Sequence, residues 1–372
     1  MSEITWTRTS LPVAHGERLG VAWSPNGGRL AVLSPGHEIS LWDALNGSLE
    51  RILKKTESSP ARGVAFSSDN SRIASVLENG KVQIWECESG DVVRVESDDR
   101  FGMPVVAWSP DRRTLAVVRD YNIELWDSYS GEAMRRANAG HAISVLAWSP
   151  NGESLALAGG AVIRLWGSDL MPRGRFRLGL QQANERTTAV AWSPQADRLF
   201  TAGENGMIQV WNAKTLAPER TLPGHSGLVT QVAASADGRV LASKSMDGSI
   251  RFCDLTEWQN IGMDRESAAE GPFPTLAFHP TLPILASADP ERSAVTIRHF
   301  RRKDAVEARP VQVFISYSRN DIEFRRARWF RNWEMWSGEG GSSAGATKRS
   351  CRDKRGVRRF SRSSNPRKSL CC

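Results

Sequence analysis

Apolar residues alternate with small or polar residues along the first 300 positions of the chain, and turn-forming residues interrupt the alternation at regular intervals. Val21 and Trp23 are followed, across one such interruption, by Leu30 and Val32. A period of two is typical of β-strands that bury one face. We therefore expect short strands joined by tight turns in this part of the chain.

Two short motifs recur along this stretch. The first is an apolar residue, an alanine and usually an aromatic residue, at 21–23, 64–66, 106–108, 146–148, 190–192, 232–234 and 276–278. The second is an apolar residue, usually a tryptophan, and usually a polar residue, at 41–43, 84–86, 125–127, 165–167, 210–212, 252–254 and 297–299. Successive copies of the first motif lie 40 to 44 residues apart. A period of this length indicates seven structural repeats.

Turn residues divide each repeat into four short segments. Pro25 follows the first motif and has no N–H for a strand ladder, and the Asn26-Gly27 pair behind it tolerates positive φ. The pairs Asn79-Gly80 and Asp247-Gly248 mark the next hairpin in their repeats. Each repeat is therefore expected to form a four-stranded antiparallel sheet.

A period in the low forties, four strands and a closing Trp-Asp pair resemble the WD-repeat family. The resemblance implies an all-β protein, a seven-bladed β-propeller over residues 1–303. Burial of each aromatic anchor is expected to contribute roughly 1.5 to 3 kcal/mol. The tryptophans expected to anchor the blades are Trp23, Trp42, Trp85, Trp108, Trp126, Trp148, Trp166, Trp192 and Trp211.

The seventh repeat ends without a fourth strand. Nothing after Ile297-Arg298-His299 has the pattern of that strand, whereas residues 3–9 do. We expect the N-terminal segment to complete the last blade, because pairing the two ends of the ring removes its open sheet edge.

In the family, a histidine after glycine joins a Ser or Thr, the Asp of a hairpin turn and the repeat's Trp in a hydrogen-bonded network. By resemblance, His225 has Asp247 and either Ser243 or Ser245 as partners in the sixth repeat, but Cys253 replaces the Trp. The network is therefore expected to be incomplete there.

The fourth repeat offers His141 and Trp166, but Gly159-Gly160 stands where the Asp is expected. Apolar packing should then dominate the blades. The last two blades, with Cys253 and Arg298 in place of Trp, are expected to be the least regular.

No catalytic or metal centre is indicated. The six histidines are scattered over the repeats, so a structural role is favoured for each over a metal or acid–base role. The five cysteines lack metal-ligand spacing. We expect no cofactor and no metal.

Composition is that of a soluble globular protein, with 40% hydrophobic and 24% charged residues. No apolar run of about eighteen residues and no secretory signal is present, so a cytoplasmic location without membrane contact is expected. The net charge of +8 is concentrated at the C-terminus, where residues 311–372 carry 15 basic and 5 acidic side chains.

Residues 304–310 are charged and end in Pro310, as in a short linker. An apolar strand then runs into a polar turn, and residues 311–336 resemble the start of a TIR domain, a doubly wound α/β fold. The match to its first box consists of Phe314, Ile315, Ser316, Tyr317, Ser318, Arg319 and Asp321. The pattern is lost soon after Arg325, which suggests a lost reading frame or a decayed gene. Residues 337–372 are expected to be a disordered basic tail.

These patterns predict a non-catalytic scaffold whose propeller binds a protein partner on one face. The TIR resemblance implies TIR-type signal transduction, TIR–TIR association in intact relatives, and a bacterial origin. The alternative is an NAD-hydrolysing TIR enzyme regulated by the propeller, which needs a glutamate that this chain does not reach in recognisable form. Nucleic acid is not expected, because aromatic residues are not interleaved with the charges of the tail.

Overall fold

The computed structural model describes residues 4–12, 20–34, 38–44, 46–53, 59, 61–77, 79–96, 105–119, 121–177, 186–266, 275–289 and 294–302. All of them belong to one compact unit, Met1–Val306. The predicted linker 304–310, the TIR-like segment 311–336 and the basic tail 337–372 lie outside the described residues. None of the described residues forms a helix that is long and apolar enough to cross a membrane.

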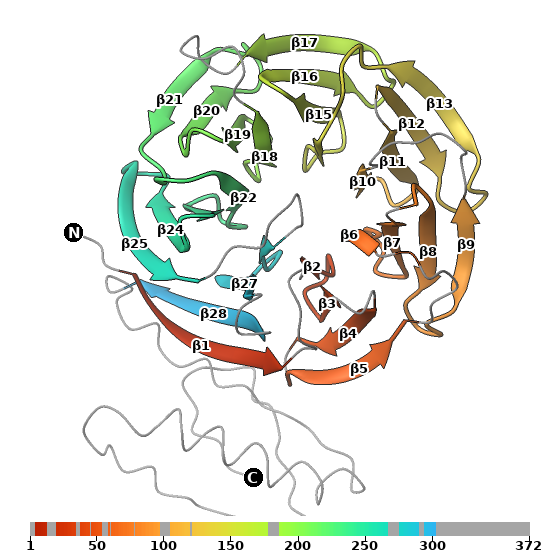
Figure 1. The fold of residues 1–372 in the computed structure, drawn as a ribbon, viewed down its shortest axis with the longest axis horizontal. Helices are drawn as coiled ribbons and strands as arrows, with labels where there is room; N and C mark the ends of the chain where they lie inside the picture. Colours follow the sequence, from red (N-terminus) through yellow and green to blue (C-terminus); the bar gives the residue numbers. More distant parts are fainter. Residues whose placement is uncertain are drawn as a thin grey trace, which may run out of the picture. The chain divides into compact units, whose positions relative to one another are not determined.

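Seven four-stranded antiparallel sheets, here called blades 1 to 7, surround a common axis (Figure 1). This confirms the predicted all-β, seven-bladed propeller. Blades 1 to 3 contain β2 (Gly20–Trp23), β3 (Arg29–Leu33), β4 (Ile39–Asp43) and β5 (Ser48–Ile52); β6 (Ala61–Phe66), β7 (Arg72–Leu77), β8 (Val82–Glu86) and β9 (Val92–Glu96); and β10 (Val105–Trp108), β11 (Thr114–Arg119), β12 (Asn122–Asp127) and β13 (Ala133–Asn138).

Blades 4 to 6 follow in the same order, with the first strand innermost and the fourth on the outer rim. They contain β14 (Val145–Trp148), β15 (Ser154–Gly159), β16 (Val162–Gly167) and β17 (Pro172–Arg177); β18 (Thr187–Trp192), β19 (Arg198–Gly203), β20 (Ile208–Asn212) and β21 (Pro218–Leu222); and β22 (Val229–Ala234), β23 (Val240–Ser245), β24 (Ser249–Asp254) and β25 (Gln259–Arg265).

Blade 7 joins the two ends of the propeller. It contains β26 (Leu276–Phe278), β27 (Ile284–Asp289), β28 (Ala294–Arg302) and, as its outermost strand, β1 (Ile4–Pro12). The closure by the N-terminal segment is confirmed, but the strand runs to Pro12 and not only to residue 9. It is longer because β28 has nine residues and pairs with β1 along its whole length, from Ile4 with Arg302 to Pro12 with Ala294.

The hydrophobic core consists of seven clusters in the described residues, and each lies between two neighbouring blades. The second strand of six blades shows how: a large residue such as Leu30 is fully buried on one face, and a small residue such as Ala31 is fully buried on the other; blade 5 has Phe200 in place of the alanine. Leu30 packs with Ala286 of blade 7, whereas Ala31 packs with Val64 of blade 2. Because no blade buries both faces alone, the stability of the ring depends on every blade having two neighbours.

The last two blades were expected to be the least regular, and the register contradicts this. In blades 1 to 6 the pairing of the third and fourth strands shifts at the second motif, as between Leu41 and Trp42. Blade 6 has this shift and a second one between β22 and β23, as blades 2 and 5 have between their first two strands, and blade 7 has none. In blade 7 the fourth strand comes from the other end of the chain, so no tight hairpin distorts its pairing with β28.

Candidate protein-binding face

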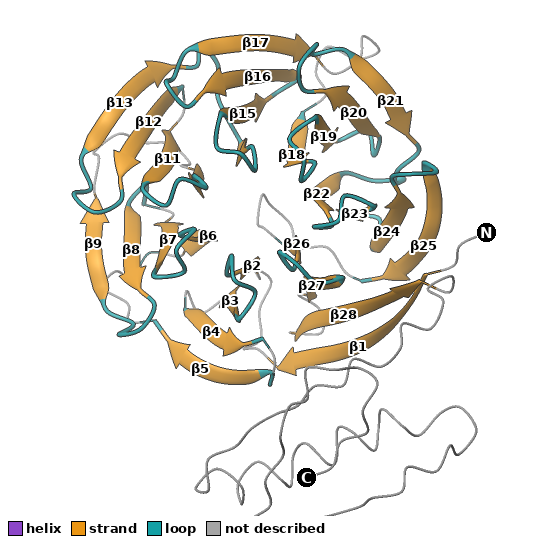
Figure 2. Cartoon of the chain, turned by 180° about the vertical axis from the view of Figure 1, so that it is seen from behind, coloured by secondary structure: helices purple, strands orange, loops and turns teal. Residues whose placement is uncertain are grey.

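The strand order determines which turns lie together. Because successive strands within a blade are antiparallel, the turns from first to second and from third to fourth strand lie on one face of the ring. The turns from second to third strand lie on the opposite face (Figures 1 and 2). We call the first the serine face and the second the hairpin face.

On the serine face, a buried serine ends the first strand in most blades. Its hydroxyl accepts a hydrogen bond from the backbone N–H five residues later, at 2.8 Å for Ser24 and 2.9 Å for Ser67, Ser149, Ser193 and Ser235. The bond satisfies an N–H that the turn would otherwise leave unpaired. These serines are therefore structural.

His279 takes the place of this serine in blade 7. Its Nδ1 accepts hydrogen bonds from the N–H groups of Thr281 (3.1 Å) and Leu282 (3.0 Å), so its Nε2 carries the proton and donates to the carbonyl oxygen of Gly27 (3.2 Å). Burial lowers the pKa of His279. Gly27 has φ +72°, and a Cβ there would lie 2.1 Å from the imidazole, so only glycine fits. The histidine joins blade 7 to blade 1 and is not available for catalysis.

His225 lies in blade 6 within a network that resembles a Ser-His-Asp triad. Its Nε2 is 2.8 Å from the hydroxyl of Ser243, and its Nδ1 is 3.0 Å from Asp247 and 3.1 Å from Ser249. Of the two serines that the sequence left open, Ser243 is the partner, while Ser245 donates to a backbone oxygen. The imidazole is fully buried. A substrate cannot reach it, so the network holds the hairpin turn in place.

Burial lowers the pKa of His225, and the nearby Asp247 carboxylate opposes that effect only in part. His141 in blade 4 is also buried enough to have a lowered pKa, and its Nδ1 donates to the carbonyl oxygen of Ala139 (3.1 Å). His141 Nε2 and Trp166 Nε1 have no hydrogen-bond partner within the described part of the chain. The structure thus does not bring His141 and Trp166 together as a network.

The other anchor tryptophans fall into two geometric groups. In the first motif, the indole N–H donates to the alanine carbonyl of the same motif in the preceding blade: Trp23 to Ala277 (3.0 Å), Trp108 to Ala65 (3.0 Å), Trp148 to Ala107 (3.2 Å) and Trp192 to Ala147 (3.1 Å). In the second motif, it donates to a side chain of its own blade: Trp42 to Ser40, Trp126 to Glu124 and Trp211 to Thr201. Trp85 is buried in the core between blades 1 and 2. Nothing in the sequence pattern indicated that the first group would link neighbouring blades.

A cluster of buried charges joins blades 6 and 7, and sequence reasoning missed it. Arg298, which stands where other blades have Trp, is only 1% exposed. Its Nε lies 2.8 Å from Asp264, and its terminal nitrogens bond Glu266 and Ser287. Lys244, fully buried, donates to Glu266 at 2.7 Å.

The N-terminal strand enters this cluster through Arg8, which pairs with Asp264. Burial alone would raise the pKa of the Glu266 carboxyl, but Lys244 and Arg298 together hold it below its usual range. Buried charges are tolerated only when paired and hydrogen-bonded, and each member here has such a partner. The cluster therefore fastens the blade that closes the ring.

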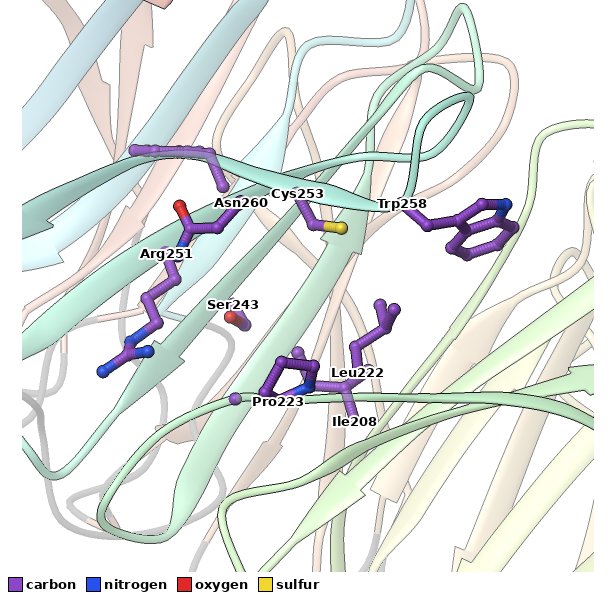
Figure 3. A pocket seen from close by; sticks show the side chains of 10 residues that line it. Ile208, Leu222, Pro223, Ser243, Arg251, Cys253, Trp258 and Asn260 are labelled. Atoms are coloured by element: carbon purple, nitrogen blue, oxygen red, sulfur yellow. The ribbon is translucent and has the colours of Figure 1, made fainter. Parts of the chain in front are cut away.

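A cavity of about 40 Å³ lies between blades 5 and 6 (Figure 3). Leu222 and Pro223 line one side, and Cys253 and Asn260 line the other. Small-molecule sites usually measure roughly 300 to 1,000 Å³. The cavity is instead explained by Cys253, which fills less space than the Trp of the other blades. Burial raises the pKa of the Cys253 thiol to about 11, so it is not a nucleophile at neutral pH.

The described residues contain no group of three or more His, Cys, Asp or Glu side chains that could hold a metal ion. The hairpin face, however, exposes three large apolar side chains at turns of three blades. They are Tyr121 between β11 and β12 (51% exposed), Met207 between β19 and β20 (40%) and Met246 between β23 and β24 (44%). Each lies in a turn that also contains polar residues. An apolar residue in such a turn is the sequence signal that could have indicated an exposed binding residue.

Comparison with known proteins supports the repeat assignment. Residues 47–86, 180–212 and 216–254 match the WD domain, G-beta repeat family. The chain is 33% identical over 82 residues to the periodic tryptophan protein 2 homolog of Caenorhabditis elegans, covering 22% of this chain and 9% of that protein. It is 26% identical over 154 residues to the Dictyostelium discoideum homolog, covering 40% and 17%.

A third relative is eukaryotic translation initiation factor 3 subunit I of Culex quinquefasciatus, 28% identical over 74 residues, covering 20% of this chain and 23% of that protein. The chain thus spans less than a quarter of the length of each of these relatives. The matched segments 47–86 and 216–254 each contain the fourth strand of one blade and the first three strands of the next, and 180–212 contains the first three strands of blade 5. The chain is thus a seven-bladed β-propeller that is similar to the WD40-repeat family in three of its segments.

Proposed function

We propose that this propeller is a non-catalytic scaffold that binds a protein partner through its hairpin face. The hairpin face exposes Tyr121, Met207 and Met246 on turns of three different blades, and the serine face exposes Tyr129, Met171 and Leu282. The observation that carries the proposal is therefore the exposure of the first three together with the ion pairing of the serine-face turns. Aromatic residues and methionine are enriched at protein interfaces, and exposed apolar groups held on a rigid support are a common mark of such sites.

The polar side chains of the serine face are paired with one another. This face carries ion pairs within and between blades, such as Arg29 with Glu50 of the same blade (2.7 Å) and Arg29 with Glu88 of blade 2 (2.8 Å). Tyr129 on this face is held by Asp69 and by the guanidinium of Arg72 above its ring. Its polar side chains are thus already engaged with one another, which favours the hairpin face as the binding surface.

The matched relatives support a role in assemblies in a general way, because translation initiation factor 3 subunit I is by its name a subunit. We further propose a cytoplasmic, bacterial protein in TIR-type signal transduction, with TIR–TIR association in intact relatives. That part rests on the sequence of residues 314–321 alone.

The proposal is tested with the full chain as bait. The variant Tyr121→Glu/Met207→Glu/Met246→Glu should lose partners that the wild type retains. The control Met171→Glu/Leu282→Glu changes two apolar residues of similar or greater exposure on the serine face, at 63% and 45%, and should retain them. Equal retention by both variants would refute binding through the hairpin face. Turnover of NAD by the purified chain would instead support the enzyme alternative.

A further inference from the structure

The outer rim between blades 3 and 4 carries an unusual concentration of arginine. Strand β17 on the rim contains Arg173, Arg175 and Arg177 and no acidic residue, and β13 contains Arg135 and Arg136 and no acidic residue. Four of the other five rim strands, β5, β9, β21 and β25, each contain both an arginine and an acidic residue. The rim is therefore locally basic at blades 3 and 4.

The register places these side chains together. Arg175 pairs with Arg164 of β16, so both lie on the same side of the sheet, whereas Arg173 is the extra residue of a β-bulge, where the pairing shifts from Leu165 with Gly174 to Trp166 with Pro172. A hollow of about 270 Å³ is lined by Arg164, Pro172, Arg173, Gly174 and Arg175. Three positively charged side chains thus face one open hollow.

No carboxylate among the described residues forms an ion pair with these side chains, although the Asp169 carboxylate lies near Arg173 beside Gly167. Within the described part of the chain, no ion pair involves Arg164, Arg173 or Arg175, although thirteen ion-pair contacts are formed elsewhere. Arg135 reaches across from blade 3, but to the backbone oxygen of Asp169 (3.5 Å). The Arg164 guanidinium contacts the carbonyl oxygen of Ala139, and its buried Nε has no partner among the described residues.

The backbone beside the hollow is also open to a partner. Strand β17 is the last in the order β14-β15-β16-β17, so its outer edge has no neighbouring strand in the described sheet. Figure 1 shows β17 along the outer rim. An extended peptide that pairs with such an edge gains main-chain hydrogen bonds, and its alternate side chains meet those of the edge strand.

We propose that β17 is a docking edge for an extended acidic peptide segment of a partner protein, with carboxylates at alternate positions that enter the arginine hollow. Arginine matches a carboxylate with two parallel hydrogen bonds, which gives both affinity and register. Nucleic acid would use the charges alone, whereas the peptide uses the charges and the unpaired strand edge. Basic side chains also keep edge strands from aggregating, and that role alone would give no binding of an acidic peptide.

This docking edge is a more specific form of the proposed protein-binding function and rests on it. A peptide of defined sequence tests the docking edge separately from binding at the hairpin face. Fluorescence anisotropy on the full chain measures binding of a labelled peptide that alternates Thr and Glu. Binding should weaken about tenfold or more in Arg173→Glu/Arg175→Glu. The control Lys214→Glu/Arg239→Glu makes the same change in net charge at two exposed residues of blades 5 and 6 and should bind like the wild type.

Two further probes distinguish strand pairing by a peptide from binding through charge alone. The same peptide with methyl groups on alternate backbone nitrogens keeps its charge but cannot pair with β17, and it should bind more weakly. A single-stranded oligonucleotide of similar charge should bind less tightly than the peptide. Absence of peptide binding, equal weakening by both charge variants, no effect of methylation, or tighter binding of the oligonucleotide would each overturn the proposal. Partner loss by the hairpin-face variant is independent of these outcomes.

Discussion

The indole N–H of Trp23 donates to the carbonyl oxygen of Ala277 at 3.0 Å, across 254 residues of sequence. It is the same bond that joins Trp148 to Ala107 in consecutive blades, at 3.2 Å. Blade 1 is therefore attached to blade 7 near the axis just as blade 4 is attached to blade 3. On the rim, β1 makes the second attachment by pairing with β28.

Replacing Trp23 with Phe should lower the free energy of unfolding by about 1 to 2 kcal/mol, because the Ala277 oxygen loses its donor and some apolar contact is lost. Urea denaturation of the full chain would measure it. Trp148→Phe removes the same bond between consecutive blades and should cost a similar amount. A loss in Trp148→Phe with none in Trp23→Phe would show that the closing bond adds no stability.

Replacing Arg298 with Met should destabilise the chain by about 3 to 5 kcal/mol, because Asp264 and Glu266 then stay buried with fewer positive partners. Thermal and urea unfolding would measure the loss. Arg239→Met, at an exposed position, is the control and should change stability little. A stable Arg298→Met protein would mean that the cluster contributes little to ring closure.

The sequence allowed most of the fold to be predicted because the propeller repeats a local pattern. Trp42 and its counterparts mark every period, and the missing strand after His299 pointed to the N-terminus as its source. The buried cluster was not predictable in the same way. Lys244 and Glu266 are residue types that are usually exposed, and only the approach of blade 7 to blade 6 buries them.

The binding face was partly predictable. The sequence indicated that turns would gather on two faces, but Met207 and Met246 could not be assigned to one exposed surface before the hairpins were placed. From the sequence, Arg298 indicates only that the seventh repeat lacks the Trp of the second motif. A charged residue at an aromatic position gives no sign of its partners when they are more than thirty residues away, as Asp264 is.

Stability should fall as the pH is lowered from 7.5 to 5. Burial lowers the pKa of His141, His225 and His279 in the folded chain relative to 6.5. The unfolded chain then binds more protons, so their contribution is complete above about pH 6.5 and is lost as the pH falls through the folded pKa values. Urea unfolding at a series of pH values would measure the slope.

His279→Ser introduces the serine that the six other blades have at this turn. It also removes one of the three histidines whose pKa is lowered by burial. The dependence of stability on pH should therefore become shallower in this variant than in the wild type. A wild-type protein that is equally stable at pH 5 and pH 7.5 would contradict the expected direction. An unchanged slope in the variant would exclude His279 as a contributor.

Cys253→Leu should raise the free energy of unfolding by about 1 kcal/mol, because the larger side chain enters a cavity of about 40 Å³ that the missing indole leaves between blades 5 and 6. Cys87→Leu is the matched control: Cys87 is 1% exposed within the packed core between blades 1 and 2, so the extra atoms should cost about 1 to 3 kcal/mol. The two substitutions should thus shift the midpoint of urea denaturation in opposite directions relative to the wild type. If both variants lose stability, the space beside Cys253 is too small or too polar for an apolar side chain, and water bound there would be its better occupant.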